Sequence, residues 1–235
     1  MEANVLGKTV VEYAGRVFEV SYGGPSTRDT IREIFSKQEY PFVDFIKDVD
    51  VIVDIGANIG IASLYFHCIY PNADIFSFEP DLGAFSLLTM NTEKISNIHR
   101  VNAACSDYDG EAVFHRIIGI ETGYVGNSIH GTGFVIPGHN DLITIKIFNT
   151  CHLLRKNGIS SIDILKIDTE GCDVQVLRSI ISNGLTSRII YIESHSSDDF
   201  FEIHKIISST HVLWISNYRG MSHMYIDRKY INILY

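Results

Sequence analysis

Residues 51–60 read VIVDIGANIG, and this stretch decides the fold. Its first five residues form a short apolar run typical of a buried strand, and Gly56 and Gly60 follow where a helix is predicted to begin. Glycine lets the backbone approach a ligand closely, and the free N–H groups of a helix N-terminus favour a carboxylate or phosphate. The stretch therefore predicts a strand, a ligand-binding turn and a helix.

The same rhythm continues to the C-terminus. Short apolar runs alternate with helical stretches, which predicts an α/β sandwich with a mostly parallel sheet and an antiparallel last strand over residues 224–234. The expected strands are Val51–Ile55, Asp74–Phe78, Arg100–Ala104, Ile162–Ile167, Arg188–Glu193 and Val212–Ser216. The expected helices are Ile59–Ile69, Leu82–Ile95, Asp173–Ser182 and Asp198–Ser208. Ligands bind at the carboxyl ends of strands in such sheets, so candidate residues are sought there.

Residues 1–48 are predicted to form a small cap on a core of residues 49–235. Alternation of polar and apolar residues around Ala14-Gly15 predicts a hairpin, and Ser26 or Thr27 is expected to cap a following helix. The segment 119–140 contains six glycines and shows no period. We interpret it as a mobile loop that covers the substrate, with a passive insertion as the alternative.

Composition narrows the class of protein. The chain has 235 residues, of which 46% are hydrophobic and 20% charged, so a globular domain is expected. A net charge of −9 argues against a nucleic-acid partner held by its phosphate backbone. No stretch reads as a transmembrane helix or secretory signal, and the four cysteines lack metal-site spacing. We expect free thiols, no membrane partner and a cytoplasmic location; the oligomeric state stays open.

Two carboxylates are candidates for binding a nucleotide-like cofactor. Glu79 follows the second core strand, where it could accept hydrogen bonds from both hydroxyls of a ribose. Asp107 follows the third strand and could accept from an adenine amino group. The dinucleotide fingerprint needs glycine where Asn58 and Ile61 stand, which weakens an NAD interpretation.

Three motifs in this order resemble one known family. VDIGANIG at residues 53–60, FEP at 78–80 and LKIDTEG at 165–171 look like the FkbM family of S-adenosylmethionine-dependent methyltransferases. The resemblance implies a class I, Rossmann-like core with seven strands, S-adenosylmethionine as methyl donor, and O-methylation of a hydroxyl. It assigns donor binding to five residues of this chain: Asp54, Gly56, Asn58, Gly60 and Glu79. The chain departs from the family at Asp173, where glutamate is common.

The fourth and fifth core strands end in a second group of polar residues. Their neighbouring ends should bring together Asp168, Glu170, Glu193 and His195. Methyl transfer to an alcohol requires removal of a proton, which a carboxylate or histidine can accept. The same set could instead bind Mg²⁺ or Mn²⁺, or be structural, and we assign no metal.

Together these observations predict an O-methyltransferase that uses S-adenosylmethionine. Its expected acceptor is a hydroxyl of a sugar, a glycan or another small molecule. Two alternatives remain: an NAD-dependent oxidoreductase or epimerase, and a catalytically silent fold that binds a cofactor or partner.

Overall fold

The computed structural model describes residues 5–118, 122, 127–129, 138–217 and 221–231. The strands are β1 (Gly7–Tyr13), β2 (Arg16–Tyr22), β3 (Val51–Ile55), β4 (Asp74–Phe78), β5 (Ile98–Val101), β6 (Ala104–Ser106), β7 (Gly110–Ile117), β8 (Asn140–Asn149), β9 (Ile164–Ile167), β10 (Ile189–Glu193), β11 (His211–Ser216) and β12 (Ser222–Asp227). The helices are α1 (Pro25–Lys37), α2 (Ile61–Ile69), α3 (Leu82–Thr92), α4 (Thr150–Lys156), α5 (Asp173–Ser182), α6 (Ser197–Ile207) and α7 (Arg228–Ile231). None of the helices in these ranges is long and apolar enough to cross a membrane.

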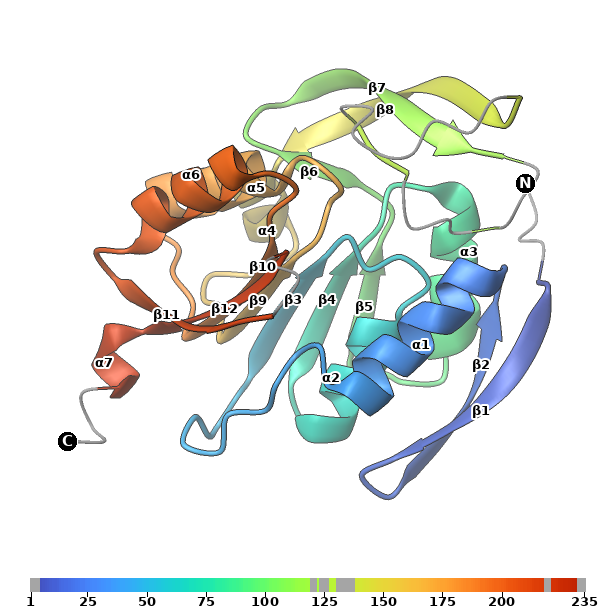
Figure 1. Cartoon of the computed structure of the whole chain (residues 1–235), viewed down its shortest axis with the longest axis horizontal. Helices are drawn as coiled ribbons and strands as arrows, with labels where there is room; N and C mark the ends of the chain where they lie inside the picture. The colour runs from blue at the N-terminus through green and yellow to red at the C-terminus, as the bar shows by residue number, and fades with distance from the viewer. Residues whose placement is uncertain (1–4, 119–121, 123–126, 130–137, 218–220, 232–235) are drawn as a thin grey trace.

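A seven-stranded sheet forms the centre of the molecule (Figure 1). Its order is β11-β12-β10-β9-β3-β4-β5. β12 runs antiparallel to both of its neighbours, while the pairs from β10 to β5 are parallel. The chain builds outward from β3 through β4 to β5 and then returns to place β9 on the other side of β3. This change of direction opens a crevice at the carboxyl ends of β3 and β9, where ligands bind in such folds. The predicted class I architecture is confirmed.

Helices cover both faces of this sheet because successive strand residues point to opposite sides. Ile52, Ile75 and Ile164 belong to one buried cluster with α2, whereas Val53 and Leu165 belong to another with α5. Figure 1 shows α1, α2 and α3 on one side of the sheet and α4, α5 and α6 on the other. Apolar faces on both sides explain why the central strands read as continuous hydrophobic runs.

The N-terminal hairpin and helix are present as predicted, with one difference at the helix start. β1 and β2 pair across Ala14-Gly15. The N-cap of α1 is Gly24, and Thr27 lies one turn inside, where its hydroxyl accepts from the amides of Gly23 and Gly24 at 3.1 and 3.0 Å. Neither Ser26 nor Thr27 is therefore the cap.

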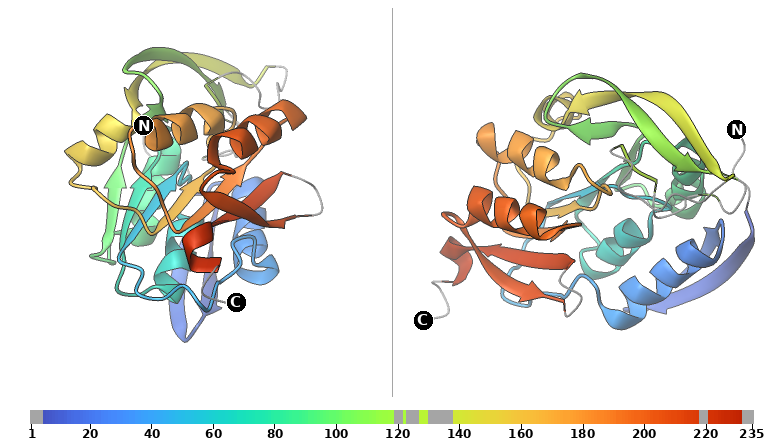
Figure 2. Two further views of the ribbon diagram at one scale, coloured as in Figure 1. Left: turned by 90° about the vertical axis from the view of Figure 1, so that its left-hand side faces the viewer. Right: turned by 45° about the horizontal axis from the view of Figure 1, so that its top comes forward.

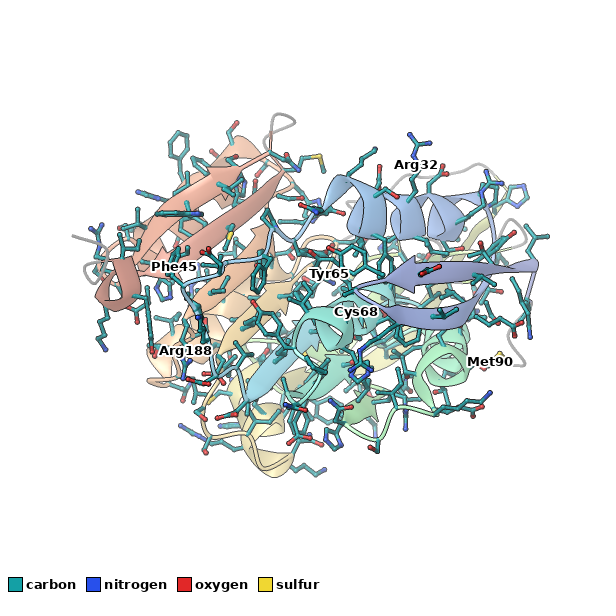
Figure 3. All side chains as sticks on the ribbon, turned by 90° about the horizontal axis from the view of Figure 1, so that it is seen from below. Arg32, Phe45, Tyr65, Cys68, Met90 and Arg188 are labelled. Atoms are coloured by element: carbon teal, nitrogen blue, oxygen red, sulfur yellow. The ribbon has the colours of Figure 1, made fainter. Side chains whose placement is uncertain are left out.

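This N-terminal segment shares its core with the sheet. Tyr65 of α2 packs against this segment (Figure 3). The centroid of its ring lies 5.4 Å from that of Tyr13 and 5.7 Å from that of Phe35. Its hydroxyl donates to the carbonyl of Tyr40 at 2.8 Å. Arg32 projects from the opposite, exposed face of α1. The boundary at residue 48 stays a prediction, since one apolar cluster runs across it.

Two predicted strands differ from the structure. The expected strand Arg100–Ala104 is divided, because Asn102 turns away to donate to the carbonyls of Glu79 and Pro80 at 2.8 and 3.1 Å. β5 then stays in the main sheet, while β6 pairs with β8. The expected last strand ends at Asp227 rather than Leu234, and α7 follows because the Asp227 carboxylate accepts from the Lys229 amide.

The long hairpin β7–β8 was not predicted. It forms a three-stranded sheet with β6 (Figure 2). The alternation of buried and exposed residues predicts these strands only weakly, because large apolar residues such as Val113 and Leu142 are exposed in them. The predicted loop 119–140 overlaps this hairpin at Asn140, and most of its remaining residues lie outside the described ranges.

Candidate active site

A cavity of about 820 Å³ opens at the carboxyl ends of the central strands. One wall comes from the turns after β3 and β4. A second wall comes from the ends of β9 and β10. The remaining sides are closed by α1, by the β11–β12 hairpin, and by Phe114 of β7 with Asn127 and Ile129 from the segment that follows it. The wall residues used below are Glu33, Lys37, Glu39, Gly56, Asn58, Glu79, Asp81, Lys166, Asp168, Glu170, Glu193 and Ser222.

The turn after β3 lies close against its neighbours. Gly56 has a φ of 80°, and a Cβ there would collide with the carbonyl oxygen of Asp168, so no other residue fits. Asn58 has a φ of 49°, and its buried Oδ1 has no hydrogen-bond partner among the described residues. Gly60 is the N-cap of α2, where a Cβ would lie 2.6 Å from Leu88. Gly56 and Asn58 line the cavity directly, while Gly60 allows close helix packing behind it.

Glu79 is held at the end of β4 and lines the same wall. Its two carboxylate oxygens accept from the backbone amides of Asn58 and Asp81, both at 2.8 Å. Burial raises the pKa of Glu79 to about 8. The Asn58 bond joins the two predicted donor-binding segments, so the turn after β3 and the end of β4 form one surface.

Asp54 does not line the cavity. Its side chain is fully buried, accepts from the Ser63 hydroxyl at 2.6 Å, and lies 3.1 Å from the ammonium nitrogen of Lys166. Lys166 also donates to the carbonyl of Gly56 at 2.6 Å and lies 3.5 Å from Asp168. In this structure Asp54 supports the turn through Lys166, which bonds the Gly56 carbonyl, and the assignment of Asp54 to donor binding stays a prediction.

Lys166 itself was missed in the sequence, although its signal is visible there. It is a lysine inside the four-residue apolar strand β9, and it is only 2% exposed. Burial alone would lower its pKa, but Asp54 and Asp168 raise it, so the ammonium form is held. A charged lysine at such a position needs carboxylate partners, as Asp54 and Asp168 provide.

Three of the four predicted acceptor-side residues line the opposite wall: Asp168, Glu170 and Glu193. Burial raises the pKa of all three carboxyl groups, and for Glu170 it reaches about 8. Glu170 has a φ of 54°, so the strand end turns sharply there. The predicted convergence of these two strand ends is present, because β9 and β10 are parallel neighbours.

His195 stands beside this group, in a smaller neighbouring hollow rather than in the cavity wall. Its Nε2 lies 3.3 Å from Asp173 and its Nδ1 lies 3.9 Å from Glu170. The neighbouring Asp173 carboxylate raises the pKa of His195 to about 9, although burial opposes it. Asp173, the departure from the family pattern, is anchored by the amides of Thr169 and Gly171. It orients the histidine rather than facing the cavity.

A fourth carboxylate reaches this wall from a distant part of the chain. Glu39 follows α1, and its carboxylate lies 3.1 Å from the Ser222 hydroxyl, which also lies 3.0 Å from Glu193. Burial raises the pKa of Glu39. Residues 39 and 222 carry no motif, so their meeting at the site could not be read from the sequence.

Asp107 lies outside the cavity. It follows β6, which has left the main sheet, and its carboxylate is 3.9 Å from Arg178. This placement argues against the predicted contact with an adenine ring.

Two solved structures share this architecture. The fibrillarin/Nop5p complex matches with a TM-score of 0.51 at 10% identity, over 97% of this chain and 99% of that one. Fibrillarin from Aeropyrum pernix, solved with natively bound S-adenosyl-L-methionine, matches with a TM-score of 0.50 at 11% identity, covering 94% and 83%. At this identity the likeness shows the fold alone.

Curated relatives are closer in sequence. 31-O-demethyl-FK506 methyltransferase FkbM from Streptomyces tacrolimicus is 27% identical over 173 residues, 63% of this chain and 66% of that protein. Hexuronic acid methyltransferase AglP from Haloferax volcanii is 24% identical over 161 residues, 68% and 62%. 2-O-methyltransferase NoeI from Sinorhizobium fredii is 26% identical over 160 residues, 65% and 65%. The matched part thus spans less than two thirds of each relative's length.

Residues 54–219 match the model of the methyltransferase FkbM domain, which covers the turn after β3, the end of β4 and both acceptor-side strand ends. The chain belongs to the FkbM methyltransferase family.

Proposed function

We propose that the chain transfers a methyl group from S-adenosylmethionine to a hydroxyl of a sugar, a glycan or another small molecule. The observation that carries this proposal is that one cavity has both a wall that suits the donor and an opposite wall lined with carboxyl groups. Its volume of about 820 Å³ lies at the upper end of small-molecule sites, enough for two ligands in contact.

The donor wall fits S-adenosylmethionine in three ways. Gly56 leaves the turn without a side chain, and the buried Oδ1 of Asn58 can accept a hydrogen bond. Each carboxylate oxygen of Glu79 accepts one hydrogen bond from a backbone amide, and its remaining lone pair can accept a second from a ribose hydroxyl. When bound, the donor supplies an electrophilic methyl group on a sulfonium.

The acceptor wall supplies groups that can bind and deprotonate a hydroxyl. An alcohol is a poor nucleophile until its proton leaves, and a positioned base accelerates such steps by about 10²–10⁴-fold. His195, with a pKa of about 9, is already protonated at neutral pH and lies outside the cavity wall. The base therefore comes from Asp168, Glu170 or Glu193 in its ionised form; burial raises the pKa of all three carboxyl groups, so the ionised form becomes more abundant as pH rises.

The activities of the relatives support the proposal. They include a methyltransferase acting on a 31-O-demethyl compound, one acting on hexuronic acid and a 2-O-methyltransferase. The net charge of −9 weighs against a nucleic-acid acceptor.

The donor assignment is tested by calorimetry with S-adenosylhomocysteine. Glu79→Ala removes the two hydrogen bonds proposed to the ribose hydroxyls, about 0.5–1.5 kcal/mol each for a neutral carboxyl group and more for an ionised one, so affinity should fall about tenfold. Glu111→Ala, on the exposed strand β7, is the control and should bind like the parent. Unchanged affinity in Glu79→Ala would reject the assignment.

A thermal-shift comparison separates the rival functions. A ligand that binds the folded state raises the unfolding temperature, so S-adenosylhomocysteine should stabilise the chain and NAD should not. Stabilisation by NAD alone would favour an oxidoreductase. Donor binding without methyl transfer to any of a panel of hydroxylated acceptors would favour a catalytically silent fold.

A further inference from the structure

We propose that Asp168, Glu193 and His195 bind one divalent cation at the acceptor end of the cavity. The binding itself is independent of the proposed methyl transfer, and only its role in activating a hydroxyl rests on that function.

The three side chains already converge. One potential ligand atom from each lies within 4.8 Å of the other two. Cations such as Mn²⁺ hold their ligands at about 2.1–2.2 Å, so neighbouring ligand atoms stand about 3 Å apart and opposite ones about 4.3 Å. Small side-chain rotations would therefore close this set around an ion. Two parallel, adjacent strand ends, β9 and β10, carry the ligands, which gives them a rigid base.

The surroundings of the Glu193 carboxylate favour a bound cation. Within the described ranges, no lysine, arginine or histidine nitrogen lies within 4 Å of its carboxylate. Its hydrogen-bond donor is Ser222, whose single proton is shared with Glu39. Lys166 lies against Asp168 but is also bonded to Asp54 and Gly56. Buried carboxylates without a full partner favour a bound positive charge.

The surroundings of His195 resemble those of a metal-binding histidine. A ligating imidazole usually directs its other nitrogen to a carboxylate or carbonyl, which fixes the ring. Here Asp173 lies 3.3 Å from Nε2 and Glu170 lies 3.9 Å from Nδ1. Asp173 is only 3% exposed and is itself held by the amides of Thr169 and Gly171. An acceptor therefore stands beside whichever ring nitrogen does not take the cation.

Such a cation would sit in the wall between the cavity and the smaller hollow. Asp168 and Glu193 line the cavity, and His195 lines the hollow. A bound cation lowers the pKa of a hydroxyl that reaches it, and Glu170, which is not among the three proposed ligands, could accept the proton in its ionised form. Two carboxylates and one neutral imidazole suit Mn²⁺ and similar divalent ions, and binding would release the second imidazole proton of His195 to solvent.

The test uses Mn²⁺ as the probe and the full chain after treatment with chelator. Titration followed by electron paramagnetic resonance of free Mn²⁺ should show one saturable site per chain. Asp168→Asn, Glu193→Gln and His195→Gln should each weaken binding at least tenfold. The control is Asp109→Asn, which removes the same charge from another carboxylate paired with a histidine, His152 at 3.2 Å, away from the cavity. It should bind Mn²⁺ like the parent.

Binding of S-adenosylhomocysteine by each variant shows that the fold is intact. A parent chain without a saturable Mn²⁺ site, or variants with parental Mn²⁺ affinity, would overturn the proposal. Methyl transfer that continues unchanged in chelator would remove the cation's role and leave the methyltransferase proposal standing. Mn²⁺ binding in a chain that fails to bind S-adenosylhomocysteine would support the cation site and reject the methyltransferase proposal.

Discussion

At the scale of single residues, Lys166 connects the two halves of the candidate site. It bonds the Gly56 carbonyl in the donor turn and approaches carboxylates on both β3 and β9. Asp54, its fully buried partner, depends on it for charge compensation. We therefore expect Lys166 to hold the donor turn against the acceptor-side strand end.

Lys166→Met should destabilise the protein strongly. It leaves Asp54 buried with no cation, a change that costs about 3–5 kcal/mol when one partner of a buried pair is removed. The double variant Asp54→Asn/Lys166→Met removes both charges and should recover much of this loss. Urea denaturation measures both. The interpretation is wrong if the single and double variants lose the same stability, or if neither loses any.

At the scale of elements, one buried hydroxyl makes three hydrogen bonds at the start of α1. The Thr27 side chain is 1% exposed, accepts from the amides of Gly23 and Gly24, and donates to the Gly24 carbonyl at 2.9 Å. The same helix carries Glu33 and Lys37 into the cavity wall. A change at its start should therefore affect both stability and the acceptor side.

Thr27→Val keeps the shape of the side chain and removes its hydrogen bonds. Leaving buried amides unpaired costs about 1–3 kcal/mol, so the free energy of unfolding measured by urea denaturation should fall by about this amount. Arg28→Ala, on the exposed face of α1, is the control and should stay within about 0.5 kcal/mol of the parent. Equal stability of the two variants would show that the start of α1 is held by other contacts.

At the scale of the whole molecule, the cluster of buried carboxyl groups predicts a pH dependence of stability. The pKa values of Glu79 and Glu170 are raised to about 8, and that of His195 to about 9. Each group holds its proton more tightly in the folded state. The stability that each contributes is therefore fully present below its unfolded pKa and is lost as pH rises through its folded pKa.

The ligand-free protein should therefore lose thermal stability between pH 7 and 8.5. Buried histidines with a lowered pKa, such as His211 and His223, act in the opposite direction but have finished titrating below this window. Glu170→Gln removes one contributing group and should flatten the decline in unfolding temperature, whereas Glu111→Gln should not. A flat profile in the parent chain, or parallel profiles in parent and Glu170→Gln, would contradict this explanation.

The predicted covering loop belongs to this scale as well. Most of residues 119–140 lie outside the described ranges, so its role stays a prediction. β7 leads to this segment, and its last residue begins β8. Among its described residues, Thr122 and Ser128 form isolated bridges to Gly23 and His115, and Asn127 and Ile129 line the cavity.

The sequence by itself determined the order of the core elements and the two motifs that define the site. Hydrophobic periodicity and glycine positions are local signals, and they act through backbone geometry that tertiary packing seldom reverses. The turn at Gly56, the strand end at Glu79 and the meeting of Asp168, Glu170 and Glu193 could therefore be predicted.

The tertiary structure alone decided which of these side chains face the cavity. Asp54 lies in the same motif as Gly56, yet Lys166, 112 residues later, binds it from beneath. Asp107 moves away because β6 leaves the main sheet to pair with β8. Glu39 and Ser222 meet across 183 residues of chain. Such pairings depend on which surfaces are buried together. Burial and charge compensation act between elements that are distant in the sequence, so no local sequence pattern predicts them.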